Sequence, residues 1–300
     1  MHVIVVVGPT TAGKSGLAIE LAKALDGEVV NADSMQLYRG MDIGTAKVSA
    51  QERQGIPHHL LDIWPVTRTA NAAEYQVLVR AALDEIIARG RTPILAGGSG
   101  LYIRAALDDL NFPRTDGSTR SRLESELAVA GAPAMHARLA TKDPAAAASI
   151  LPSNGRRIVR ALEVVELTGQ PFSANLPDYT KSRPAIHLGL TLPRPELDAR
   201  ITARVDHMLS AGLEAEVRTL AAHGLRDGKT ARRALGYQQL LGYLDGEWTL
   251  DQAREETIKA TRRFARRQES WFRRDPRIHW LNPAGDLRAQ ALAVTEATLS

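Results

Sequence analysis

The chain has 300 residues and a mass of 32.6 kDa, which is enough for one large domain or two modest ones. Hydrophobic residues make up 44% and charged residues 24% of it, and these proportions exclude a disordered chain and a coiled coil. The absence of cysteine excludes a disulfide framework, a thiol nucleophile, a zinc–cysteine site and an iron–sulfur cluster. No apolar run is long enough for a signal peptide or a membrane span, so we expect a cytoplasmic protein, and we expect a monomer.

The net charge of +4 is unevenly distributed along the chain. Residues 1–113 have a net charge of −2, whereas residues 114–300 have 28 Lys and Arg against 22 Asp and Glu. The segment Arg254–Arg274 alone has eight basic and three acidic residues, interleaved with Phe264, Trp271 and Phe272. A basic segment with aromatic residues indicates either a polyanionic partner or a solvated amphipathic helix.

The first third of the chain alternates predicted strands and helices. The β-branched run Val3–Val7 predicts a strand, followed by a helical pattern. Further strands are expected at Glu28–Ala32 and Pro93–Ala96, with a helix over Ala73–Arg89 between them. Strands separated by helices predict an α/β core with a mainly parallel sheet flanked by helices.

From residue 114 the pattern becomes helical, and a further strand is expected over 186–192. We therefore expect an inserted all-helical subdomain over 114–185, within a core formed by 1–113 and 186–300. Its expected helices are Ser118–Ala130, Met135–Ala140, Pro144–Ile150 and Arg156–Thr168. Later helices are expected near 196–223, 232–245 and 249–273, before a last apolar run at 278–281.

A phosphate-binding loop is the strongest motif. The sequence Gly8-Pro9-Thr10-Thr11-Ala12-Gly13-Lys14-Ser15 matches G-x-x-x-x-G-K-[ST] and lies between a predicted strand and a predicted helix. Backbone N–H groups and the Lys14 ammonium can then bind a phosphate, and the Ser15 hydroxyl can ligate Mg²⁺. The motif predicts a P-loop NTPase-like core that binds a di- or triphosphate, and leaves the reaction open.

An ordinary P-loop NTPase also has a carboxylate at the end of a second strand. Here the strand Pro93–Ala96 runs instead into Gly97-Gly98-Ser99-Gly100, whose small residues can make room for a ligand. Asp33 follows another strand and is best placed to face the phosphate loop, because ligands lie beyond the carboxyl ends of parallel strands. Asp33 is either a general base or magnesium-shell ligand, or a structural cap.

Two other clusters can be interpreted in more than one way. His58 and His59 point to opposite faces of an extended segment, which argues against a shared metal ion. Arg200 and Arg204 are four residues apart on one predicted helix face, so they either bind a diphosphate or pair with nearby carboxylates at the surface.

Taken together, the motifs resemble the tRNA dimethylallyltransferase (tRNA isopentenyltransferase) family. The similar segments run in order along nearly the whole chain, and the stretch from Asp33 to Lys47 is the most specific of them. They are Gly8–Ser15, Asp33–Lys47, Pro57–Leu60, Gly97–Tyr102, Arg156–Val164, Arg200–Met208, Gly236-Tyr237 and Thr261–Gln268.

The resemblance implies a specific reaction. The family transfers a dimethylallyl group from dimethylallyl diphosphate to N6 of adenosine 37 in tRNAs that read codons beginning with U. The phosphate loop would then hold the diphosphate of the prenyl donor, with Mg²⁺, and the basic half would hold the anticodon stem-loop. The target base must leave its stack to reach such a pocket.

The resemblance also implies roles for individual residues. Asp33 is similar to the family's general base, and Thr10, Lys14, Ser15 and Arg204 match its diphosphate contacts. The positions implied to contact tRNA are Asp33, Ser34, Met35, Gln36, Ser99, Arg120, Arg156, Arg157, Ile158, Val159, Arg160, Arg233, Gly236, Tyr237 and Gln238.

Two positions depart from the family pattern, in which Thr usually stands at Ser99 and Lys or Arg is common at Gln238. The second departure removes one possible phosphate contact. Two rival functions remain open at this point: a small-molecule kinase that uses ATP at the phosphate loop, and a non-enzymatic RNA-binding protein.

Overall fold

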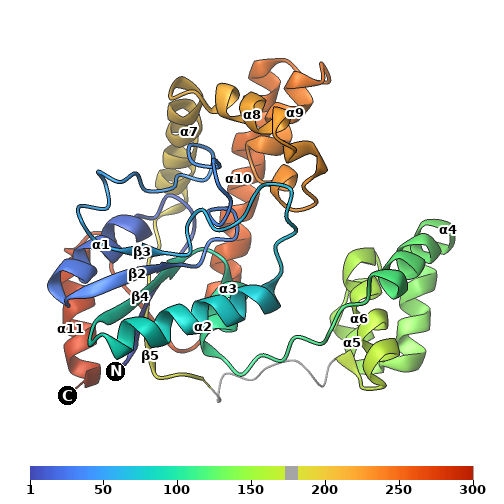
Figure 1. The fold of residues 1–300 in the computed structure, drawn as a ribbon, viewed down its shortest axis with the longest axis horizontal. Helices are drawn as coiled ribbons and strands as arrows, with labels where there is room; N and C mark the ends of the chain where they lie inside the picture. The colour runs from blue at the N-terminus through green and yellow to red at the C-terminus, as the bar shows by residue number, and fades with distance from the viewer. Residues whose placement is uncertain (173–181, 300) are drawn as a thin grey trace. The chain divides into compact units, whose positions relative to one another are not determined.

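The computed structural model describes residues 1–172 and 182–299 (Figure 1). The chain divides into two compact units. The core unit comprises Met1–Leu107 and Ser182–Ser300, and the insertion unit comprises Asp108–Lys181. Both boundaries of the insertion unit lie a few residues before those expected at 114 and 185. Among the described residues, no helix is both long enough and apolar enough to cross a membrane.

The core unit is built on a parallel six-stranded sheet, as the sequence predicted. The strand order is β3-β2-β4-β1-β5-β6, and every neighbouring pair is parallel. The strands are β1 (Val3–Val7), β2 (Gly27–Asn31), β3 (His58–His59), β4 (Thr92–Gly97), β5 (Ala185–Gly189) and β6 (Ile278–Trp280). Because β1 lies between β4 and β5, the loop that follows it opens at the middle of the sheet.

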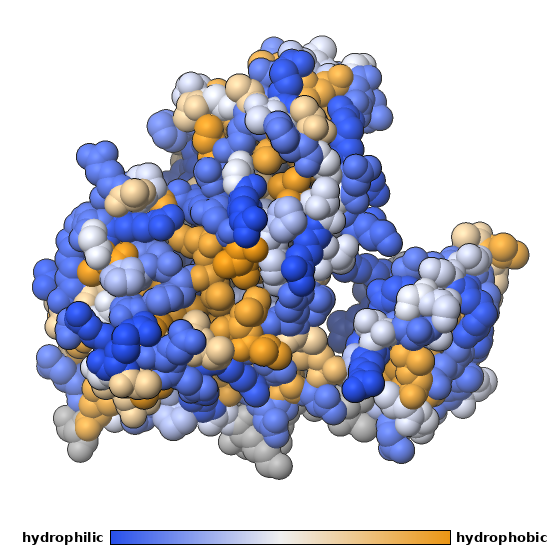
Figure 2. All heavy atoms as spheres, in the orientation of Figure 1, coloured by the Kyte–Doolittle hydropathy of each residue, from blue (hydrophilic) through white to orange (hydrophobic). Residues whose placement is uncertain are grey.

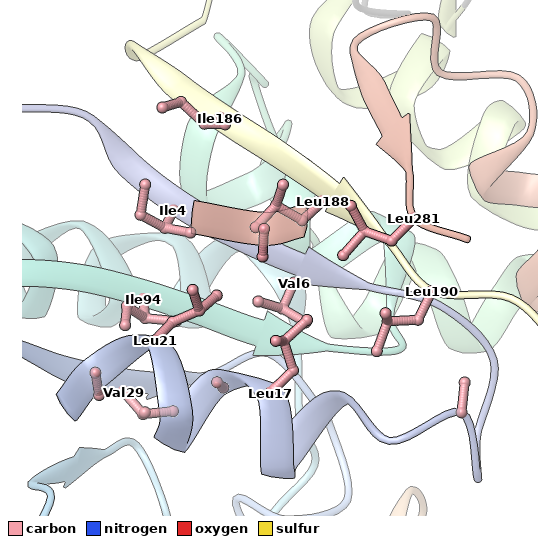
Figure 3. Close-up of a cluster of buried hydrophobic side chains, with 14 residues drawn as sticks. Ile4, Val6, Leu17, Leu21, Val29, Ile94, Ile186, Leu188, Leu190 and Leu281 are labelled. Atoms are coloured by element: carbon pink, nitrogen blue, oxygen red, sulfur yellow. The ribbon is translucent and has the colours of Figure 1, made fainter. Parts of the chain in front are cut away.

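Helices flank the sheet. They are α1 (Lys14–Ala24), α2 (Ala72–Ala88), α3 (Gly100–Leu107) and α11 (Leu287–Leu299). A cluster of buried aliphatic side chains joins α1 and α11 to one face of the sheet (Figure 3). Ile4 and Val6 of β1 lie in this cluster with Leu17 and Leu21 of α1, which come from the pattern that predicted this helix.

The core unit contains four further α-helices in its C-terminal part, within the described residues 182–299, and the segment between β2 and β3 is irregular. These helices are α7 (Arg194–Ser210), α8 (Leu213–Ala222), α9 (Tyr237–Leu244) and α10 (Leu250–Phe272). The single helix expected near 196–223 is interrupted at Gly212, which has a left-handed backbone with φ of 102°. The helix expected near 232–245 begins only at Tyr237. The sequence interpretation missed both β3 and α11.

The insertion unit is all-helical. It consists of α4 (Gly117–Lys142), α5 (Pro144–Ser149) and α6 (Gly155–Thr168), packed around their own hydrophobic core. The two helices expected over 118–140 lie within the range of α4, which is broken at Gly131, where φ is 77° and ψ is 161°. Gly131 therefore marks a kink that only glycine adopts readily.

A buried carboxylate holds α4 and α6 together. The side chain of Glu163 on α6 is fully buried and accepts hydrogen bonds from Arg120, from Arg160 and from the backbone N–H of Asp116. Although burial raises the pKa of Glu163, the two guanidinium groups lower it further, so its net pKa lies below the usual value. The charged form of Glu163 thus stabilises the insertion unit.

We expect Glu163→Gln to destabilise the insertion unit by about 3 kcal/mol, because it leaves two arginines without their shared carboxylate. Hydrogen exchange of the α4 and α6 amides in the full chain measures this loss. Because folding lowers the pKa of Glu163, its charge stabilises the insertion unit at pH values above the unfolded-state pKa. Hydrogen-exchange protection of the wild type should therefore fall as the pH drops below about 4. Glu124→Gln, at an exposed position of α4, is the control; equal exchange in both variants would contradict the assignment.

Candidate active site

The core unit contains a cavity of about 550 Å³ where loops from the carboxyl ends of the strands meet helices α7 and α10. Figure 2 shows hydrophobic side chains gathered in a hollow of this unit. The cavity is lined by Thr10 and Thr11 after β1, Asp33–Met35 after β2, Gly44–Ala46, Gly98–Leu101 after β4, Ile201, Arg204, Val205, Met208, Arg233–Gly236, Thr257, Thr261, Phe264, Arg267, Gln268 and Trp271. Polar groups therefore border an apolar chamber.

The phosphate loop has the backbone shape that its sequence predicted. Gly8 approaches β5 so closely that a Cβ there would lie 2.5 Å from the Leu190 carbonyl oxygen. Gly13 adopts a left-handed conformation, with φ of 94°, immediately before the first turn of α1. Thr11 is also left-handed, with φ of 66°, which is costly for a residue with a Cβ. The loop is thus held in a shape that its neighbours must maintain.

Two cations face this region. Lys14 Nζ donates to the Pro9 carbonyl oxygen at 2.7 Å, within the loop. Burial lowers the pKa of Lys14 to about 8, against the opposing effect of the Asp33 carboxylate, and Arg204 lowers it as well. Among the described residues, no carboxylate lies within ion-pair distance of Arg204, which is partly buried in the cavity wall. An anion between Lys14 and Arg204 would relieve their repulsion.

The neighbouring backbone fixes the Asp33 carboxylate. The Asn31 side chain accepts from the Asp33 N–H at 2.8 Å and donates to the Asp33 carbonyl at 3.0 Å. Asp33 Oδ1 accepts from the Met35 N–H at 2.9 Å. The Tyr75 hydroxyl donates to the Asn31 carbonyl at 2.8 Å, which anchors the end of β2 from helix α2. These hydrogen bonds therefore fix the orientation of Asp33, which lines the cavity.

Burial raises the pKa of Asp33, and the Met35 N–H and the Lys14 ammonium partly offset this rise. A carboxylate with a raised pKa is a stronger proton acceptor, which suits a general base. Asp33 and Lys14 come from loops 19 residues apart in sequence, and the sheet brings them into electrostatic contact at the middle of its carboxyl edge. The placement expected for Asp33 from the sequence is thus the one observed.

The segment between Gln36 and Lys47 carries Gly44–Ala46, which form one wall of the chamber. The Gln36 side chain donates to the Thr45 carbonyl at 3.0 Å. The Lys47 ammonium is almost completely buried and contacts Asp42 and Asp62, each at 2.6 Å. These polar contacts explain why this stretch carries so many charged and amide residues without being a helix or a strand.

Glu216 on α8 holds this wall in place. The sequence interpretation missed this residue. Its carboxylate accepts from the backbone N–H groups of Asp42, Ile43 and Gly44 at 3.1, 2.8 and 3.3 Å, and from the Tyr237 hydroxyl at 2.5 Å. A Cβ at Gly44 would lie 2.4 Å from the Tyr237 ring, so this position requires glycine. No local motif signals this arrangement, because α8 and the wall are about 170 residues apart.

The structure places some of the predicted site residues in the cavity lining and others outside it. Ser34, Met35, Ser99, Arg233 and Gly236 line the cavity with Asp33, Thr10 and Arg204. Arg200 instead forms an exposed ion pair with Glu196 at 2.7 Å, the surface alternative for this residue. Gln238 is exposed outside the cavity lining, and Gln36 supports the wall from behind.

Three side chains implied to contact tRNA are buried. Tyr237 is fully buried beneath the wall, and Ile158 and Val159 lie in the hydrophobic core of the insertion unit. Their side chains are therefore packing groups here, rather than groups free to touch RNA. In the insertion unit, Arg156 and Arg157 are exposed, whereas Arg120 and Arg160 are engaged by Glu163.

His58 and His59 each contact a separate partner. His59 Nε2 bonds Glu28 at 2.6 Å, and His58 Nδ1 contacts the Ile56 carbonyl at 2.9 Å. Across residues 1–172 and 182–299, no group of three His, Asp or Glu side chains is arranged to hold a metal ion. The exposed Ser15 hydroxyl at the start of α1 fits a cation only together with oxygens from a bound diphosphate.

Comparison with known proteins identifies the family. The family model described as IPP transferase matches residues 36–275. The chain belongs to the IPP transferase family. It is 62% identical to the tRNA dimethylallyltransferase of Thermobifida fusca, over 97% of this chain and 93% of the relative.

Solved structures of the IPP transferase family agree with the fold. The full-length tRNA isopentenylpyrophosphate transferase from Bacillus halodurans is 39% identical, with a TM-score of 0.72, over 99% of this chain and 95% of that chain. A eukaryotic dimethylallyltransferase acting on tRNA is 27% identical, with a TM-score of 0.82, over 99% of this chain and 77% of that chain. The P-loop NTPase-like core predicted from the sequence is therefore confirmed.

We expect Glu216→Gln to loosen the wall, because an amide cannot accept all four hydrogen bonds. Hydrogen exchange of the Asp42, Ile43 and Gly44 amides should accelerate by roughly 10- to 100-fold, about 1.5–3 kcal/mol for charged hydrogen bonds. Glu214→Gln is the matched control, because Glu214 on the same helix pairs only with exposed Arg218. Unchanged exchange in the Glu216 variant would show that the wall is held by other contacts.

Proposed function

We propose that this protein transfers a dimethylallyl group from dimethylallyl diphosphate to N6 of adenosine 37 in tRNAs that read codons beginning with U. The products are N6-(dimethylallyl)adenosine and diphosphate. The observation that carries the proposal is that Asp33 and Arg204 line one largely apolar chamber and that both interact electrostatically with Lys14 of the phosphate loop. The proposal also rests on the names of relatives that are more than 60% identical over nearly their whole length.

The chamber has the chemistry that this transfer requires. An exocyclic adenine amine is a weak nucleophile, so the Asp33 carboxylate accepts its proton as N6 attacks the allylic carbon. The bond from that carbon to the diphosphate oxygen breaks, and the Lys14 and Arg204 cations stabilise the charge on the departing diphosphate. Thr10 of the phosphate loop also lines the chamber and contributes a hydroxyl.

The apolar part of the chamber suits a short prenyl chain. Ile201, Val205 and Met208 of α7 line it together with Leu101 and Phe264. A five-carbon allylic group gains favourable burial there and is shielded from water, which would otherwise compete with the amine. An adenosine in this chamber must have left its stack, as for other enzymes that act on one base.

A divalent cation fits at the donor diphosphate. We propose Mg²⁺, held by diphosphate oxygens and the Ser15 hydroxyl, since the described residues offer no carboxylate cluster for it. The cation supplies additional charge neutralisation to the leaving group. The protein's own residues orient the donor through the phosphate loop.

The tRNA is proposed to contact both units. In the core unit, Arg233 and Arg267 border the chamber, and Ser34 and Ser99 offer polar groups to a base inside it. In the insertion unit, the exposed Arg156 and Arg157 provide charge for backbone phosphates. We propose that the protein acts as a monomer.

Asp33→Asn tests the base. This variant keeps the side-chain shape and the acceptor for the Met35 N–H, and we expect turnover to fall by about 100-fold or more with little change in tRNA affinity. In the wild type, turnover should fall as pH drops through a pKa above the ordinary value for aspartate, because the base must be ionised. Transfer of labelled dimethylallyl groups at saturating substrates measures both. Near-normal turnover in the variant would remove Asp33 from the mechanism.

The phosphate loop predicts a second pH dependence. The Lys14 pKa of about 8 means that the free protein loses this charge as pH rises through 8, so diphosphate should bind more weakly there and take up a proton on binding. Calorimetry with inorganic diphosphate and Mg²⁺ in two buffers measures both effects. Lys14→Met should abolish the proton uptake, and Lys23→Met on the same helix should retain it. Diphosphate affinity that stays constant from pH 7 to 9 would contradict this role for Lys14.

A further inference from the structure

We infer that Gln268 of α10 is a positioning residue that fixes the phosphate loop against the glycine-rich loop after β4. This inference rests on the proposed function, because both loops border the proposed donor and adenosine sites. The sequence interpretation assigned no role to Gln268. It lies in the middle of the basic segment, yet it is buried, with 5% of its surface exposed.

Its side-chain amide bonds to both loops at once. Gln268 Oε1 accepts from the Thr10 backbone N–H at 2.9 Å, and Gln268 Nε2 donates to the Gly98 carbonyl at 2.9 Å. Gln268 is at least 170 residues away in the sequence from each of these two partners. One planar amide therefore sets the distance between Thr10 of the phosphate loop and Gly98 of the glycine-rich loop.

The glycines of the second loop make room for α10. A Cβ at Gly98 would lie 2.1 Å from Gln268 Nε2, and a Cβ at Gly100 would lie 1.9 Å from the Trp271 indole nitrogen. The sequence suggested that these small residues make room for a ligand. In the structure, Gly98 and Gly100 line the cavity, and the space beside them also accommodates Gln268 and Trp271, two side chains one helical turn apart on α10. A ligand close to these glycines stays a prediction.

The contact with Thr10 bears on the donor site. The Gln268 amide holds the Thr10 backbone directly before Thr11, whose left-handed φ of 66° is unfavourable without support. If the amide is lost, the half-buried Thr10 loses the acceptor of its N–H, and the loop is free to relax away from the shape that presents Thr10 and Lys14. Arg267 and Trp271 of the same helix also line the chamber.

Gln268→Met tests the inference, because methionine has a similar length and no strong hydrogen-bonding group. We expect KM for dimethylallyl diphosphate to rise by about 10-fold or more, and affinity for an unmodified anticodon stem-loop to stay within about twofold. Gly98→Ala should give the same pattern without altering Gln268, because its Cβ displaces the amide from the opposite side. A donor KM that changes less than twofold in both variants would overturn the inference.

Gln290→Met is the matched control for stability. Gln290 of α11 also bonds to backbone through its amide, twice at Asn282 and once at Asp286, but it lies outside the chamber lining. The Gln290→Met change should lower the melting temperature while leaving donor KM and stem-loop affinity unchanged. If Gln290→Met raises donor KM as much as Gln268→Met, Gln268 acts only through general stability and the positioning role is wrong.

A second readout separates this inference from the proposed function. Binding of inorganic diphosphate with Mg²⁺ needs no prenyl transfer, and we expect it to weaken by about 10-fold in Gln268→Met. If the wild type transfers no prenyl group but this diphosphate result holds, the proposed function fails and the positioning role stands. If the wild type is active and diphosphate binding is equal in both proteins, the positioning role fails alone.

Discussion

The electrostatic balance between Asp33 and the two cations Lys14 and Arg204 is the constraint on which the site depends. A buried carboxylate and a buried ammonium each lose hydration, and each shifts the pKa of the other towards the charged form. With one carboxylate for two cations, the chamber favours an additional anion. In the proposed reaction the leaving diphosphate supplies that anion, and a carboxylate at the end of β4, as in ordinary P-loop NTPases, would oppose it.

The surrounding structure serves to hold these charges in place. The parallel sheet brings the ends of β1, β2 and β4 to one edge, so short loops suffice to present the phosphate loop and Asp33 together. Helices α8 and α10, from the C-terminal half of the chain, then contact the loops that border the chamber. Glu216 anchors one wall and Gln268 joins two loops, each through hydrogen bonds to backbone groups. Polar side chains buried in this way specify one arrangement of the chamber.

The sequence allowed prediction of those features that depend on local patterns. The strand Val3–Val7, the glycines of the phosphate loop and the helix after it follow from periodicity and from turn chemistry. Asp33 was placed correctly because any residue after a parallel strand reaches the same edge. The helical character of the insertion unit also followed from its pattern, although its charged centre at Glu163 did not.

The features that could not be predicted depend on contacts between distant segments. Strand β3 has two residues and exists only because it pairs with β2, and α11 has a weak pattern because only Ala291 and Thr295 are buried. Arg200 and Arg204 look equivalent in sequence, but the structure separates them, since Arg200 has Glu196 on its exposed side. The same limit applies to Glu216 and Gln268, whose partners lie far away along the chain.

Direct product analysis tests the central claim most sharply. The protein would be incubated with Mg²⁺, labelled dimethylallyl diphosphate and an unmodified tRNA with adenosines at positions 36, 37 and 38, and the RNA then digested to nucleosides. We predict label on N6 of adenosine 37 alone, one diphosphate released for each group transferred, and no consumption of added ATP. Label absent from the RNA, with ATP consumed and a small-molecule acceptor phosphorylated, would contradict the assignment of the phosphate loop to a prenyl donor.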